Sequence, residues 1–280
     1  MKYGFNLMLF GDVIGSKIQA LFPGFKQLGF DGIEVPVFEP GKVDVRGIGE
    51  AARQAGLELT CSGALPPGTR FYQGTARAQA GAIKYISDGI KVVAGLGAKV
   101  WVGPLYKAVG DFDESIPLEQ QRAETAAALK PLLKEAQEAG VVLGFEPINR
   151  FETNLINTVA QGIDFCRQLD SPNAALLLDT FHLHIEEKDS ASAVAAGAEV
   201  FAHFHCSEND RGIPGTGQVH WREIAEAVKR TGYDQWAVLE TFNQDNQAIK
   251  AAASCWRPFY PNEDEFLRQG LAFIRKLFNR

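Results

Sequence analysis

The sequence predicts an α/β fold, a (β/α)8 TIM barrel that forms a single domain over residues 1–280. Two observations support this. A helical pattern that ends in glycine and leads into a short apolar strand recurs along the whole chain, and no composition shift marks a domain boundary. Strands that alternate with helices pair in parallel. Eight such units fit a closed barrel better than an open doubly wound sheet, which stays the alternative.

Eight strands are expected, each followed by a helical segment. In chain order they are Lys2–Asn6, Gly32–Val37, Leu57–Cys61, Lys99–Gly103, Val141–Glu146, Ala174–Asp179, Val200–Cys206 and Trp236–Thr241. Glycine precedes the second to fifth strands and the eighth, at positions 29, 56, 97, 140 and 232. Glycine is favoured just after a helix because it adopts a positive φ at low cost. Residues 119–139 and 221–230 have the apolar period of amphipathic helices.

The proline- and glycine-rich stretches fall directly after strands. "ALPPGTRF" follows the third strand and "RGIPGTGQ" follows the seventh. Such clusters are typical of loops. We therefore expect them to form βα loops, the loops that build the active-site face of a barrel.

Composition excludes several classes of protein. The formal net charge is −6 without a long basic block, which argues against nucleic acid as a partner. No stretch reaches the roughly 20 apolar residues that span a membrane, and no signal peptide is evident, so we expect a cytoplasmic protein. The four cysteines lie far apart without a C-x-x-C motif, which indicates neither a thiolate zinc site nor a disulfide framework.

Four consecutive strands end in a polar, chemically active side chain. The fifth ends in Glu146, the sixth in Asp179, the seventh in His205 and the eighth in Glu240. Each alone has an ordinary explanation, since a carboxylate often caps the next helix or faces solvent and a histidine can be part of the core. Together they would form an arc at the carboxyl ends of the strands, where barrel enzymes place their active sites.

This set of side chains is typical of a divalent metal site. Three carboxylates held together would repel one another, and a cation removes that repulsion. Oxygen-rich ligands with one imidazole suit Mn²⁺, Mg²⁺ or Co²⁺, and zinc is an alternative. His203 lies on the same strand face as His205, one layer deeper, and we interpret it as a packing residue or as a support for the ligands.

With these motifs, the chain resembles the ketose 3-epimerases of the xylose isomerase-like barrel superfamily, the group of D-tagatose, D-psicose (allulose) and L-ribulose 3-epimerases. The resemblance runs from "YGFN" to "WRPFY" and is carried by "GFEPINRFE", "LLLDTFH", "FHCSENDRG" and "VLETF". It implies that one divalent ion, Mn²⁺ first and Co²⁺ or Mg²⁺ as alternatives, is bound by the four strand-end residues Glu146, Asp179, His205 and Glu240.

The resemblance also implies the chemistry. Glu146 and Glu240 would form the acid/base pair that moves the C3 proton of a free ketose from one face to the other through a metal-bound cis-enediolate. Glu152, His182 and Arg211 would contact substrate oxygens. By analogy, the protein is expected to form a homodimer or homotetramer.

Three other functions stay open at this point. An aldose–ketose isomerase of the same superfamily, similar to hydroxypyruvate isomerase, would use the same metal and move the proton between C1 and C2. A metal-dependent endonuclease would need more than the five histidines present, to bind a multi-metal cluster, and a basic face. A non-catalytic sugar-binding protein on the same barrel is the third.

Overall fold

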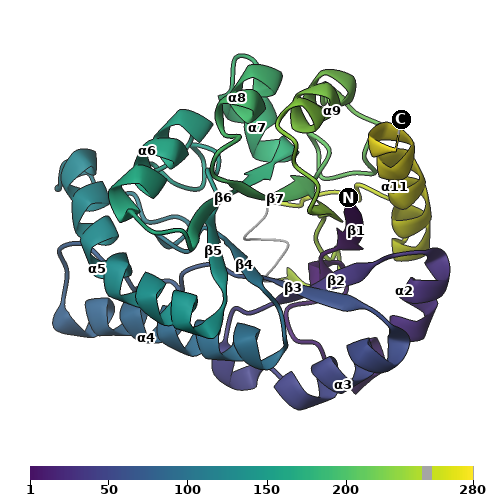
Figure 1. The fold of residues 1–280 in the computed structure, drawn as a ribbon, viewed down its shortest axis with the longest axis horizontal. Coiled ribbons are helices and arrows are strands. Elements are labelled where there is room, and N and C mark those ends of the chain that lie inside the picture. The colour runs from purple at the N-terminus through teal and green to yellow at the C-terminus, as the bar shows by residue number, and fades with distance from the viewer. Residues whose placement is uncertain (248–253, 280) are drawn as a thin grey trace.

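The computed structural model describes residues 1–247 and 254–279, and it contains an eight-stranded parallel barrel surrounded by helices (Figure 1). The strands are β1 Lys2–Phe5, β2 Gly32–Pro36, β3 Glu58–Ser62, β4 Val100–Gly103, β5 Val142–Phe145, β6 Ala174–Asp179, β7 Phe201–Cys206 and β8 Trp236–Leu239. Neighbouring strands pair in the order β1-β8-β7-β6-β5-β4-β3-β2. A parallel bridge between Asn6 and Glu34 joins β1 to β2 and closes the ring.

Helices cover the outside of the barrel (Figure 1). They are α1 Ser16–Gln19, α2 Phe22–Leu28, α3 Val45–Ala55, α4 Ala76–Gly95, α5 Leu118–Ala139, α6 Val159–Leu169, α7 Thr180–Glu186, α8 Ser190–Ala196, α9 Trp221–Arg230 and α11 Glu263–Phe278, with short 3-10 turns η1 Leu7–Leu9 and η2 Pro40–Lys42. The last helix, α11, packs near the first strand, so the two ends of the described chain lie on the same side of the barrel.

The predicted fold class is confirmed, and the open-sheet alternative is wrong. All eight expected strands are present, with ends that differ from the predicted ones by at most two residues. The assignment of residues 1–280 to one domain stays a prediction. The five glycines expected after helices all have positive φ, from 66° at Gly140 to 107° at Gly29. A residue with a Cβ would be strained at each of these positions.

The barrel interior has an apolar side and a polar side. Val100, Val102 and Leu177 form a small buried cluster on β4 and β6. Gly144 on β5 makes room for it, because a Cβ at this position would lie 2.8 Å from the Val102 side chain. The interior also encloses polar side chains, since Glu34 on β2 contacts His203 and His205 on β7.

Among the described residues, no helix combines the length and the apolar character that crossing a membrane requires.

The contact between α4 and β4 gives a test of the packing. A Cβ at Gly89 would overlap the indole ring of Trp101, whereas a Cβ at Gly49 on α3 would meet open space. We expect Gly89→Ala to lower the free energy of unfolding by roughly 1–3 kcal/mol, as overpacking does. The matched Gly49→Ala should raise it by about 0.5–1 kcal/mol, because alanine is the better helix former. Urea unfolding measures the change in the free energy of unfolding for both variants. A change of the same sign in the two variants would contradict the packing described.

Candidate active site

The four strand-end residues lie buried at the carboxyl end of the barrel. Asp179 and His205 are direct partners in the β6–β7 register. Glu146 and Glu240 lie one residue past β5 and β8, and their backbone N–H groups continue the sheet by donating to Gly103 O at 3.1 Å and Cys206 O at 3.3 Å. All four residues are at most 6% exposed. The sheet hydrogen bonds therefore fix the height at which each functional group enters the site.

Asp179 has two roles at once. Its Oδ1 accepts from the backbone N–H of Phe181 at 2.8 Å and so caps α7. Its Oδ2 faces the site, where it accepts from Arg211 at 2.7 Å. The capping explanation and the functional one are thus compatible, because each uses a different oxygen.

Arg211 supplies a positive charge to this cluster. One Nη donates to Asp179 at 2.7 Å and to Glu240 at 2.9 Å, and the guanidinium stacks on the ring of Phe181, 3.9 Å from its centroid. The side chain is buried although it belongs to a loop. Burial would lower the pKa of Arg211, but the facing carboxylates raise it. The residue stays charged and offsets the repulsion between the two acids.

His205 bridges two acids. Its Nδ1 lies 3.2 Å from Glu240 and its Nε2 lies 2.7 Å from Glu34 on β2. Burial alone would lower the pKa of His205, but the Glu240 and Glu34 carboxylates raise it well above its ordinary value. In return, although burial opposes ionisation, His205 and Arg211 lower the pKa of Glu240 to about 2.

Glu146 differs from Glu240 in its charge environment. Burial raises its pKa well above the ordinary value, and the neighbouring Glu240 and Asp179 carboxylates raise it further. The two glutamates at the outer strands of the arc therefore have pKa values that are pushed in opposite directions. Environments that separate the pKa values of two acids in this way are typical of an acid/base pair.

His182 presents a donor to the site. Its Nδ1 accepts from the backbone N–H of Asn149 at 3.0 Å, so the proton of the neutral ring is on Nε2. This Nε2 lies 3.5 Å from Glu146 and 3.3 Å from Arg211. Burial is the main reason that the pKa of His182 is lowered to about 3, so the ring is a neutral hydrogen-bond donor at pH 7.

Glu152 is held at the rim of the site by the loop after β5. Its carboxylate accepts from Asn149 Nδ2 at 2.7 Å, and its backbone O accepts from the N–H of Gly110 at 2.8 Å. Burial raises the pKa of Glu152, while Arg211 opposes this. The same loop is anchored by Tyr106, whose hydroxyl donates to Glu146 O at 2.9 Å.

The donor groups fit a divalent cation. Ligand atoms of Asp179, His205 and Glu240 lie within 4.8 Å of one another, and Glu146, Asp179 and His182 form a second such group that shares Asp179. Carboxylate oxygens with one imidazole nitrogen suit Mn²⁺, Mg²⁺ or Co²⁺. The structure thus brings the four predicted ligands into one connected cluster, and their role as ligands stays a prediction.

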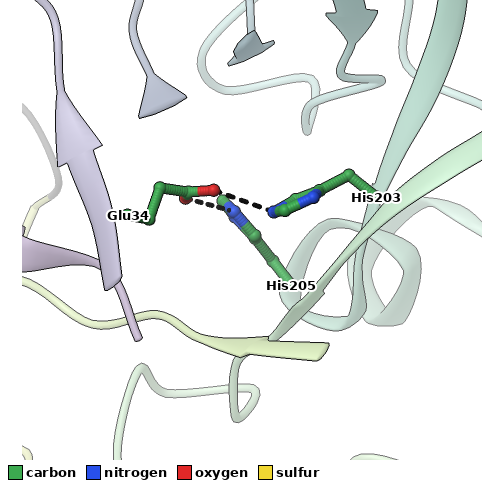
Figure 2. Close-up of side chains that lie close together, drawn as sticks. All are labelled: Glu34, His203 and His205. Carbon is green, nitrogen blue, oxygen red and sulfur yellow. Dashed lines mark hydrogen bonds and ion pairs between the residues drawn. The ribbon is translucent and has the colours of Figure 1, made fainter. Parts of the chain in front are cut away.

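Sequence reasoning missed Glu34. It is fully buried on β2 and contacts both His203 and His205 through the barrel interior (Figure 2). The available signal was a lone carboxylate inside the apolar strand "GIEVP". His203, interpreted as packing or support, lies 2.8 Å from this carboxylate.

Comparison with known proteins gives consistent matches. A family model described as "Xylose isomerase-like TIM barrel" matches residues 25–277. The chain is 30% identical over 252 residues to the ketose 3-epimerase of Arthrobacter globiformis, covering 89% of this chain and 87% of that protein. It is 29% identical over 261 residues to the L-ribulose 3-epimerase of Mesorhizobium japonicum, covering 92% and 88%.

Solved structures give the same picture. The fold is similar to the crystal structure of D-allulose 3-epimerase from Methylomonas sp. in complex with D-allulose, with a TM-score of 0.93, 26% identity, and coverage of 99% of this chain and 97% of that one.

The raised pKa of Glu146 predicts a pH-dependent cost to stability. Above the ordinary pKa of 4.5, the unfolded chain releases this proton while the folded protein retains it, so stability falls as the pH rises toward the folded pKa. Glu146→Gln removes that loss. In chelator, we expect the variant to be more stable than the parent at pH 7.5 by roughly 1–3 kcal/mol, with a smaller difference at pH 4.5.

Urea unfolding at the two pH values measures this difference. Glu138→Gln, on the exposed surface of α5, is the matched control and should show no such growth with pH. A Glu146→Gln advantage that is equal at both pH values would contradict the assigned shift.

Proposed function

Because the chain belongs to the xylose isomerase-like TIM barrel family, and within it to the ketose 3-epimerases, we propose that it epimerises free ketoses at C3 with one bound divalent metal ion. The observation that carries this proposal is the convergence of the buried acids Glu146 and Glu240, at the ends of β5 and β8, on the Asp179–Arg211 pair. The cluster holds two acids of opposed pKa shift, as proton removal and return require.

The metal is proposed to be held by the four predicted ligands, with Mn²⁺ as the first candidate and Co²⁺ or Mg²⁺ as alternatives. When bound, such an ion supplies Lewis-acid chemistry that stabilises negative charge on the substrate oxygens. It would also take over part of the charge compensation that Arg211 gives to Asp179 and Glu240. Arg211 would then be available to donate to a sugar hydroxyl.

Epimerisation requires two proton-transfer groups. The C3 proton leaves on one face of the substrate and a proton returns on the other, which a single side chain does not serve easily. Glu240, with its lowered pKa, is suited to take a proton, and Glu146, with its raised pKa, is suited to give one. In the reverse reaction, the two exchange roles.

Besides Arg211, two further residues are proposed to orient the sugar. His182 would donate from Nε2 to the C2 oxygen, because its other ring nitrogen is already engaged by Asn149. Glu152 would accept from a hydroxyl near C1 or C2. The buried side chains of Leu105 and Tyr106, after β4, would form part of the wall that keeps water away from the reacting carbons.

The comparisons also suggest the substrate class. The similar proteins are named as epimerases of ribulose, psicose, allulose and ketoses in general. We propose free ketoses of five or six carbons as substrates for this chain. A homodimer or homotetramer in the cytoplasm stays a prediction.

The activity is tested with the purified chain, stripped by EDTA and reloaded with Mn²⁺, Co²⁺ or Mg²⁺. We expect D-fructose to yield D-psicose only in the reloaded samples, as measured by liquid chromatography with D-tagatose and ribulose as parallel substrates. Aldoses as the sole products would show an aldose–ketose isomerase, and sugar binding without turnover would show a binding protein.

The two-acid scheme predicts an asymmetric set of variants. Glu146→Gln and Glu240→Gln should each lower kcat by about 10²–10⁴, the contribution typical of a general acid or base. Arg211→Ala should mainly raise KM, because its guanidinium orients rather than reacts. Steady-state kinetics with saturating metal measures both, and near-normal epimerisation by Glu240→Gln would show that the scheme is wrong.

A further inference from the structure

We propose that Glu34 is a positioning residue that holds His205 in the tautomer and orientation needed for metal binding. The proposal shares one premise with the function proposed above, namely that His205 is a metal ligand. Figure 2 shows the arrangement, in which Glu34 reaches from β2 across the barrel interior to His203 and His205 on β7.

The two nitrogens of His205 face different partners. Nε2 lies 2.7 Å from Oε1 of Glu34, and Nδ1 lies 3.2 Å from Glu240, on the side of the carboxylate cluster. A metal ion takes the lone pair of an unprotonated ring nitrogen, so the other nitrogen must carry the proton. With Nε2–H donated to Glu34, it is Nδ1 that is free to bind an ion beside Asp179 and Glu240.

Glu34 is an acceptor here rather than a metal ligand. Oε1 accepts hydrogen bonds from His205 Nε2 and, at 3.0 Å, from Asn6 Nδ2. Oε2 accepts from Thr60 Oγ1 at 2.9 Å and lies 2.8 Å from His203 Nε2. Three hydrogen bonds thus orient the carboxylate, and the His203 ring packs beside its second oxygen. Glu34, His203 and His205 are also close enough together to hold an ion of their own, and the ion stoichiometry measured in the test distinguishes that arrangement from the one proposed.

The backbone fixes this acceptor in place. Glu34 forms the bridge to Asn6, the residue that follows β1, and is paired with Thr60 on β3, so the chain on both sides of β2 sets its height in the barrel. Asn6 cannot exchange its amide ends, because its Oδ1 accepts from Met8 N at 3.0 Å. A carboxylate held this firmly limits the rotation of the imidazole ring, and a hydrogen bond that a ligating histidine donates to a carboxylate strengthens metal binding.

The test compares Glu34→Gln with Thr60→Val, which removes a donor to the same carboxylate and leaves the His205 contact intact. Metal affinity is measured by competition between protein and a chromophoric chelator for Mn²⁺ and Co²⁺, with circular dichroism as the check on folding. We expect Glu34→Gln to raise the metal Kd about 10–100-fold. Thr60→Val should stay close to the parent, and the Co²⁺ absorption spectrum should change only in Glu34→Gln.

Two results would overturn the proposal. One is an unchanged Kd in folded Glu34→Gln. The other is a stoichiometry of two ions in the parent and one in the variant, which would make Glu34 a ligand of a second ion.

If Glu34→Gln does not fold, the parent protein alone decides the question. Two-bond ¹H–¹⁵N spectra of the Mg²⁺- or Zn²⁺-loaded parent report the histidine tautomers. We expect the proton of His205 on Nε2 and the metal on Nδ1, and a proton on Nδ1 would contradict the proposal. None of these measurements uses sugar turnover, so they separate a failure of this inference from a failure of the proposed epimerase activity.

Discussion

The structure depends on one electrostatic constraint, the burial of several carboxylates at one end of a barrel. The side chains of Glu34, Asp179 and Glu240 are removed from water, and buried charges are costly unless they are paired. The positive partners come from one segment: His205 on β7 and Arg211 in the loop after it. Strand β7 is thus the common neighbour of acids from β2, β6 and β8. A divalent ion bound among these carboxylates would also compensate their negative charge.

This constraint links the fold to the chemistry. The parallel register brings Asp179 beside His205, and one further sheet hydrogen bond each places Glu146 and Glu240 at the rim. The positive charges of His205 and Arg211 compensate the charge of Glu240 more fully than that of Glu146. Glu240 therefore has a lowered pKa and Glu146 a raised one. A cluster assembled by strand geometry therefore contains two carboxyl groups whose pKa values are shifted in opposite directions. The similar proteins, named ketose 3-epimerases, fit a reaction that needs one of each.

The sequence predicted the barrel well, because glycine at helix ends and apolar runs of strand length are local signals. It also predicted which strand ends meet, since consecutive parallel strands end on one face. It could not predict Glu34, whose meaning depends on β2 lying across the interior from β7. Nor could it show Arg211 buried between two acids, because a loop residue with a φ of 63° is placed by tertiary contacts and not by a periodic pattern.

The central claim is that this site moves the proton at C3 of a ketose. Its most direct measurement is the reaction of D-fructose with the metal-loaded protein in D₂O, followed by NMR of the recovered sugars. We expect solvent deuterium at C3 of the epimerised product and none at C1. Deuterium at C1 or C2 with an aldose as product, or no deuterium in any sugar, would contradict it.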